Sequence, residues 1–189
     1  MNASVAKKID EILKLDEMAD TTSKAELADH TIAFEHVTFS YGEEQPVLKD
    51  VSFTVPDGKV TALAGVSGSG KSTAASLICR FWDITEGQIC MGGVPLNQIP
   101  LSDLMSQISF VTQNTFLFKK SIRDNIMMGN PEATEEEMMQ AAKDAVCHDF
   151  IMRLPKGYDT VLESDGANLS QGQRQLLNIA RAAVSRAPI

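Results

Sequence analysis

The spacing of hydrophobic positions changes several times along the chain. In residues 31–41, TIAFEHVTFSY, apolar and polar residues alternate imperfectly, and the run VLKDVSFTV follows after GEEQP. Alternation is typical of half-buried strands, so the two runs predict an antiparallel hairpin with its turn near Gly42 to Pro46. Residues 59–66, KVTALAGV, form a short apolar run bounded by PDG and by glycines, which predicts a buried parallel strand. The runs GQICMGG and ISFVTQ predict two more strands.

Helical spacing replaces the alternation elsewhere. Residues 4–18 place apolar residues at helical intervals, and a polar linker follows them. The residues after Gly70 predict a helix that reaches about Phe81. SIRDNIMMG predicts a short helix, and residues 134–151, TEEEMMQAAKDAVCHDFI, predict a longer one that opens with the spacing of a capping box. Strands followed by a block of helices and a return toward the sheet predict an α/β core that carries a helical insertion.

Composition and charge narrow the possible partners. The chain has 189 residues, 43% of them hydrophobic, and a formal net charge of -8. An acidic chain is repelled by nucleic acid and by anionic lipid, so we expect no nucleic-acid partner. The three cysteines are widely spaced and form no CxxC pair, which indicates reduced, buried thiols. The charged N-terminal segment does not resemble a signal peptide, and no apolar run is long enough to span a bilayer.

A phosphate-binding loop follows the predicted buried strand. GVSGSGKS, residues 65–72, fits the pattern G-x-x-x-x-G-K-[ST] at every fixed position. The glycines let successive backbone N–H groups point inward around a phosphate, and the helix that starts there adds its positive end. A glycine-rich connection between strand and helix is the plainer interpretation, but the complete match favours a site for Mg-nucleotide. The predicted phosphate and Mg²⁺ ligands are Gly65, Ser67, Gly68, Ser69, Gly70, Lys71, Ser72 and Thr73.

A second helix start also has the character of an anion site. LSQGQ, residues 169–173, precedes the helical run RQLLNIARA. Ser170 and Gln173 have the S-x-x-Q spacing of a capping box, which needs no ligand. Two interpretations therefore remain at this point: a simple helix cap, or a cap that also offers N–H groups to a phosphate.

Together these motifs resemble the nucleotide-binding domain of ABC transporters, in particular the export type. The resemblance runs from about Thr31 to Ile189. FSYG resembles the adenine-stacking loop, with Tyr41 as the aromatic residue. FVTQNTFLFKKSIRDNI resembles the Q-loop, whose Gln113 would contact Mg²⁺ and the attacking water. The resemblance implies a P-loop NTPase (RecA-like) core with an N-terminal antiparallel β-subdomain and an α-helical insertion subdomain, incomplete at the C-terminus.

The resemblance also explains why one chain would carry two anion sites. In this family two cassettes pair head to tail, and each ATP lies between one chain's phosphate loop and the other chain's signature helix. Ser170, Gly172 and Gln173 would then serve the partner's ATP in trans, while Lys71 serves the chain's own. The implied cofactors are ATP and Mg²⁺. The implied partners are a second cassette and a transmembrane domain, at the cytoplasmic face of the cell membrane.

The sequence departs from the family pattern at three places. Gln171 stands where the family usually has glycine. LESDG stands where exporters often have a Gly-Glu pair, and Glu163 or Asp165 would take over its contact between subunits. The chain ends at API, where the family continues into a strand with an Asp and the catalytic Glu, followed later by a switch His. We therefore expect a fragment that binds ATP but does not turn it over, and that is marginally stable.

The expected organisation has four parts. Residues 1–29 would be an amphipathic helix and linker from a membrane domain, and residues 30–112 the β-subdomain with the phosphate-loop core. Residues 113–170 would hold the Q-loop and helical subdomain, and residues 171–189 the signature helix. In the full-length protein this domain would couple ATP hydrolysis to transport, in most members export.

Two other functions stay open from the sequence. One is a soluble ABC-type ATPase of DNA repair or translation, although about a hundred residues between Lys71 and Ser170 leave no room for a coiled-coil insertion. The other is a degenerate cassette that binds ATP and only regulates a partner, which Gln171 would suit. The transported substrate, its direction, and the choice between homodimer and heterodimer cannot be read from these residues.

Overall fold

A hairpin of two antiparallel strands opens the fold in the computed structural model, which describes residues 7–10, 13, 18–42 and 45–189. Strand β1 (Ile32–Phe39) pairs with β2 (Leu48–Val55), and the backbone N–H of Val47 donates to the carbonyl of Phe39 at 2.8 Å. The burial of β1 alternates along most of its length, as its sequence pattern predicts. The predicted hairpin is confirmed, although residues 43 and 44 of its turn lie outside the described residues.

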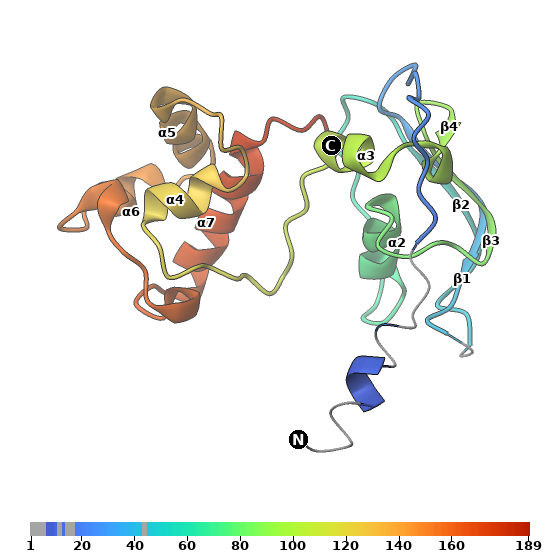
Figure 1. The fold of residues 1–189 in the computed structure, drawn as a ribbon, viewed down its shortest axis with the longest axis horizontal. Helices are drawn as coiled ribbons and strands as arrows, with labels where there is room; N and C mark the ends of the chain where they lie inside the picture. The colour runs from blue at the N-terminus through green and yellow to red at the C-terminus, as the bar shows by residue number, and fades with distance from the viewer. Residues whose placement is uncertain (1–6, 11–12, 14–17, 43–44) are drawn as a thin grey trace. The chain divides into compact units, whose positions relative to one another are not determined.

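Two further strands complete one antiparallel sheet. Strand β3 (Glu86–Met91) pairs with the free side of β1, and β4 (Val94–Pro95) follows it, giving the order β2-β1-β3-β4 (Figure 1). Irregular register between β1 and its neighbours places His36 in the left-handed region, at φ 52°. Opposite it, a Cβ on Gly87 would lie 2.3 Å from the His36 carbonyl oxygen, so only glycine fits there.

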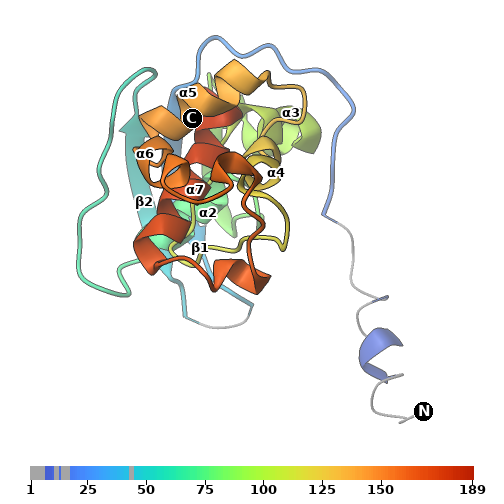
Figure 2. The same cartoon turned by 90° about the vertical axis from the view of Figure 1, so that its left-hand side faces the viewer.

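Two predicted strands are absent, which corrects the sequence interpretation. Residues 59–66 and 108–113 have no regular secondary structure and belong to none of the strands in the described part of the chain. In Figure 2 the chain between β2 and α2 runs as a long loop. Val60 is fully exposed, and Phe110 and Val111 are each about two-fifths exposed. An apolar run predicts burial, but a β-strand also needs a neighbouring strand for its ladder of hydrogen bonds, and neither segment pairs with a strand of the described sheet.

The rest of the first unit includes a helix, a 3₁₀ turn and an irregular N-terminal segment in the described residues. Helix α2 (Lys71–Ile78) follows the phosphate loop, as predicted, and the 3₁₀ turn η1 (Leu96–Gln98) follows β4. Residues 18–30, here called the strap, run ahead of β1 without regular structure. The N–H of Ala28 in the strap donates to the carbonyl of Gly92 at 3.2 Å. Ahead of the strap, residues 7–10 are helical, and the remainder of the predicted N-terminal helix lies almost wholly outside the described residues.

The chain divides into two units, residues 1–101 and 102–189, whose placement relative to each other is not determined. The second unit is helical and begins within α3 (Leu101–Gln107). Its other elements, in chain order, are α4 (Ile122–Met127), α5 (Glu135–Asp144), α6 (His148–Met152), the 3₁₀ turns η2 (Gly157–Asp159) and η3 (Ser164–Gly166), and α7 (Gln171–Val184).

One hydrophobic core holds the second unit together. Helix α7 presents Leu177, Ala180 and Val184 at helical spacing and packs them against α4 and α5. Met138 of α5 is fully buried in the same core. Burying an apolar side chain of this size contributes on the order of 2 kcal/mol, so α7 is held chiefly by its buried face.

The long helix predicted for residues 134–151 is broken into α5 and α6. Val146 adopts the left-handed conformation, at φ 56°, and its N–H donates to Lys143 O at 2.9 Å. The next N–H, of Cys147, donates to Ala142 O at 2.8 Å. This pair of bonds is a Schellman C-cap, usually built on glycine, so a valine there gave no sequence signal. The predicted capping box of α5 is confirmed, with Thr134 and Glu137 in both roles.

Candidate functional site

The glycine-rich loop turns tightly into α2. Gly68 and Gly70 both have positive φ, 81° and 84°, and Gly70 is the N-cap residue of α2. A Cβ on Gly70 would lie 2.5 Å from Cδ2 of Leu48, the first residue of β2. Glycine is therefore required at this position both by its backbone conformation and by its contact with the sheet.

Lys71 bends back over the loop that precedes it. Its ammonium Nζ donates to the carbonyl oxygens of Gly65 at 3.0 Å and Val66 at 2.7 Å, and to Ser69 Oγ at 3.2 Å. Ser72, one residue into the helix, is exposed. A cation, an exposed hydroxyl and the N-terminus of an eight-residue helix thus converge on one turn, a donor set that suits a phosphate group.

Tyr41 and Thr73 are in contact beside this turn. The spacing of residues in the sequence could not predict this contact. The phenol of Tyr41 donates to Thr73 Oγ1 at 3.2 Å. Phe39 and Trp82 pack edge-on against the Tyr41 ring, with centroids 4.8 and 5.1 Å away, and Tyr41 stays 39% exposed. Trp82 is a residue that the sequence reasoning missed, and its only signal was a lone tryptophan in the run RFWD just after α2.

Gln113 lies in the second unit, in the irregular segment that precedes α4. The residue is exposed. Further along this segment, Arg181 of α7 donates to the carbonyl of Phe116 at 3.0 Å. The same guanidinium donates to the Asn125 side-chain oxygen, also at 3.0 Å, and burial lowers the pKa of Arg181. Because Lys71 and Gln113 belong to different units, the predicted contact of Gln113 with Mg²⁺ and the attacking water stays a prediction.

The predicted helix cap at Ser170 is confirmed. Ser170 Oγ accepts from the N–H of Gln173 at 3.2 Å, and Gln173 Oε1 accepts from the N–H of Ser170 at 2.9 Å. The Ser170 hydroxyl, which is exposed, keeps its own hydrogen to donate. A Cβ on Gly172 would meet no atom of the described residues within 4 Å, and Gln171 is exposed. Packing therefore does not require glycine at 172, which leaves room for an outside group.

The segment before this cap is tied to the segment before α4. Asp165, in the left-handed region at φ 54°, accepts from the N–H of Leu117 at 3.3 Å. Leu162 N–H donates to Lys120 O at 2.9 Å, and Ser121 and Val161 form an isolated bridge. The Asp165 carboxylate therefore has a partner within its own chain. The contact between subunits that the sequence suggested for Glu163 or Asp165 stays a prediction.

A glycine-rich turn, a lysine and a hydroxyl at a helix start, next to an antiparallel sheet, define a phosphate-loop nucleotide-binding domain. A family model described as ABC transporter matches residues 48–189. The chain belongs to the ABC transporter family.

Individual relatives agree with this family. A Staphylococcus aureus (strain NCTC 8325 / PS 47) protein, named for multidrug export as an ATP-binding/permease protein, is 44% identical over 165 residues, covering 87% of this chain and 28% of the relative. A Mycoplasma genitalium (strain ATCC 33530 / DSM 19775 / NCTC 10195 / G37) protein, named as an ABC transporter ATP-binding protein, is 40% identical over 186 residues, 97% of this chain and 32% of the relative.

The fold agrees as well. A solved bacterial Atm1-family ABC exporter with ATP bound matches with a TM-score of 0.89 and 35% identity, over 96% of this chain and 32% of that one. The exporter-type ATP-binding domain that the motifs resemble is thus confirmed at the level of family and fold. The chain spans about a third of the length of the relatives it matches. Within the described ranges, no helix combines the length and apolar character needed to cross a membrane.

Proposed function

We propose that the chain binds Mg-ATP as the ATP-binding domain of an export-type transporter. The observation that carries this proposal is the convergence of Lys71, Ser72 and the start of α2 on one turn. The Lys71 ammonium would exchange its bonds to loop carbonyls for bonds to the β- and γ-phosphates, while loop N–H groups hold the α- and β-phosphates. The exposed ring of Tyr41 would stack on the adenine.

The residues present also fit Mg²⁺. In Mg-nucleotide sites the ion keeps several waters and takes phosphate oxygens, and in a phosphate-loop site the hydroxyl after the lysine supplies one of its protein ligands. Ser72 is exposed at the first turn of α2, where it can supply that hydroxyl. Gln113 would contact the ion and position the attacking water. The ion neutralises charge on the phosphate oxygens when it is bound.

The Ser170 cap would serve the triphosphate of a second cassette. Its hydroxyl and the N–H groups at the start of α7, with open space beside Gly172, form a donor surface that α7 presents outward. A head-to-tail pair would then enclose each ATP between one chain's Lys71 and the other chain's Ser170. Binding of ATP would hold the pair together, and loss of the γ-phosphate would loosen it.

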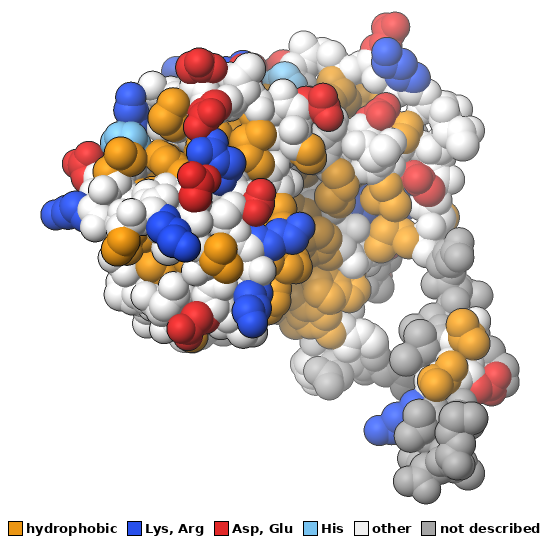
Figure 3. All heavy atoms as spheres, turned by 60° about the vertical axis from the view of Figure 1, so that its left-hand side comes forward, with side chains coloured by type: hydrophobic (Ala, Val, Ile, Leu, Met, Phe, Trp, Pro, Cys, Tyr) orange, Lys and Arg blue, Asp and Glu red, His pale blue; other side chains and the backbone are white. Residues whose placement is uncertain are grey.

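The other partner is a transmembrane domain of the same transporter. Hydrophobic side chains reach the surface among charged ones (Figure 3). In the second unit Phe116 and Phe118 are 56% and 45% exposed and pack edge to face, with centroids 5.0 Å apart. We infer that this exposed aromatic pair contributes to the contact with the transmembrane domain. We place the domain at the cytoplasmic face of the membrane, where it couples ATP hydrolysis to export.

Titration with a fluorescent ATP analogue in the presence of Mg²⁺ tests the central claim. Lys71→Ala removes the cation that contacts the phosphates, and we expect affinity to fall at least about tenfold, as for hydrogen bonds to charged groups. Lys59→Ala, an exposed lysine of the same unit, is the matched control and keeps the affinity of the unaltered chain. Equal affinity in the Lys71 variant would overturn the proposal.

A further inference from the structure

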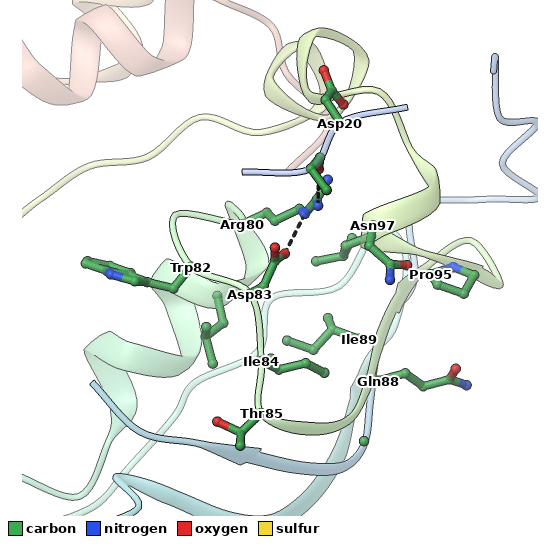
Figure 4. Close-up of a pocket in the computed structure, with 14 residues that line it drawn as sticks. Asp20, Arg80, Trp82, Asp83, Ile84, Thr85, Gln88, Ile89, Pro95 and Asn97 are labelled. Carbon is green, nitrogen blue, oxygen red and sulfur yellow. Dashed lines mark hydrogen bonds and ion pairs between the residues drawn. The ribbon is translucent and has the colours of Figure 1, made fainter. Parts of the chain in front are cut away.

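A buried arginine ends the phosphate-loop helix. Arg80 is 4% exposed and left-handed, at φ 50°, and its N–H donates to Leu77 O at 3.0 Å. Its Nε donates to the carboxylate of Asp83 at 2.9 Å, and its Nη2 donates to the carbonyl of Ala19 at 2.6 Å (Figure 4). One side chain thus holds together the turn after α2 and the beginning of the strap.

The next strap residue holds a second element. The carboxylate of Asp20 accepts from the N–H of Leu101, the first residue of α3, at 3.0 Å. Because Ala19 and Asp20 are neighbours, the strap is fastened at one place to both the end of α2 and the start of α3. At its other end, Ala28 N–H donates to Gly92 O, so the strap is fixed at both ends.

These contacts border a cavity of about 420 Å³. Asp20, Arg80 and Asp83 line it together with apolar side chains such as Ile84 and Ile89 (Figure 4). The buried Nη1 of Arg80 has no hydrogen-bond partner among the described residues. Two carboxylates against one guanidinium make the lining net negative, which excludes an anion as the natural occupant. The contacts that Arg80 does make therefore define its role as a tether.

The turn that Arg80 stabilises is connected to the nucleotide site in two ways. Helix α2 has eight residues, so roughly 12 Å of rigid helix separates its end from Lys71 at its start. The bond from Arg80 to Asp83 also closes the turn that carries Trp82. Trp82 packs on Tyr41, whose phenol donates to Thr73.

We propose that Arg80 is a positioning residue that couples the strap to the nucleotide site. Seating of residues 19 and 20 and binding of ATP then stabilise each other, and the coupling is reciprocal because both act on the same turn. Displacement of residues 19 and 20 would lower the affinity of the phosphate loop for ATP. Bound ATP would in turn stabilise the contacts of the strap. The inference rests on the nucleotide binding proposed above.

Hydrogen exchange of the 189-residue chain, with and without Mg-ATP, tests the coupling at the Leu101 amide, which is bound by the strap. We expect Mg-ATP to slow its exchange severalfold in the unaltered chain and to have no effect in Arg80→Gln. The ATP affinity of Arg80→Gln should fall on the order of fivefold. Arg153→Gln, an exposed arginine of the second unit, serves as the control and behaves as the unaltered chain.

Two more variants separate coupling from loss of fold. Arg80→Lys keeps a cation for Asp83 but has no second nitrogen for the carbonyl of Ala19. We expect its melting temperature to fall less than that of Arg80→Gln. Mg-ATP should nevertheless no longer slow the exchange of its Leu101 amide. Asp20→Ala removes the hydrogen bond between the strap and the N–H of Leu101, and Asp20 itself is exposed. We expect this variant to bind ATP more weakly as well. ATP affinity that stays unchanged in Asp20→Ala, or ATP protection that persists in Arg80→Lys, would overturn the proposal. An unaltered chain that binds no ATP would instead overturn the proposed function.

Discussion

Burial sets the chemistry of individual side chains in this domain. Desolvation raises the pKa of Cys79 and of Cys147 to about 11, and both thiols are free and almost completely buried. The sequence predicted reduced, buried thiols from their number and spacing, and the structure confirms that they are buried. Arg80 is also buried, and Arg181 is partly buried. Their guanidinium groups donate hydrogen bonds to backbone carbonyls and side chains of their own chain.

A prediction on pH follows for the two thiols. In the unfolded chain each ionises near its ordinary value of 9.0, whereas in the fold each stays neutral to about 11. Their contribution to stability is therefore complete below pH 9 and is lost as pH rises from 9 toward 11. We expect the denaturation midpoint in urea to fall over this interval, and Cys79→Ala together with Cys147→Ala to reduce the slope.

Alkylation tests the burial of the same thiols independently. At pH 7.5, iodoacetamide should leave Cys79 and Cys147 unmodified in the folded chain and modify both in denaturant, as mass spectrometry of peptides would show. Rapid modification under native conditions would mean that the two side chains are not buried as described.

At the scale of the element, helix starts are specified locally and helix ends are not. Capping boxes open α4, α5 and α7, each with a hydroxyl at the cap and a partner three residues later. All the atoms of such a box lie within four residues, so a sequence pattern can report it. The end of α5 depends on Val146 adopting the left-handed conformation, which a β-branched residue rarely takes, so its sequence does not report the helix end.

The cap of α7 allows structure and function to be separated. Aspartate is as good an N-cap as serine, so Ser170→Asp should keep the helix within about 0.5 kcal/mol of its original stability. Its negative charge would repel the partner's γ-phosphate, and we expect ATP-dependent dimerisation to be lost while each chain still binds ATP. Light scattering with and without Mg-ATP measures this. A Ser170→Asp chain that still dimerises with ATP would confine the cap to a structural role.

At the scale of the whole molecule, the site residues are divided between two units. Lys71, Ser72 and Tyr41 belong to the sheet-bearing unit, and Gln113 and Ser170 to the helical unit. None of these side chains is a histidine or a carboxylate, the groups that most often act as a general base toward water.

We therefore expect the 189-residue chain to bind Mg-ATP without turning it over. Phosphate release, followed with purified chain and Mg-ATP, should not rise above the background given by Lys71→Ala. Mg-dependent release that the Lys71 substitution abolishes would contradict this expectation and would require a base among residues not assigned to the site.

The sequence by itself determined what is encoded by residues close together in the chain. The hairpin, the phosphate loop with Lys71 at its end, and the caps at Thr134 and Ser170 all follow from local spacing, and the family follows from those motifs in order. The tertiary structure decided what depends on distant partners. It left residues 59–66 outside the described sheet despite their apolar pattern, joined Tyr41 to Thr73, and fastened Ala19 to Arg80. A periodic pattern reports which face of a segment is apolar, whereas the partner that covers this face is chosen only when the chain folds.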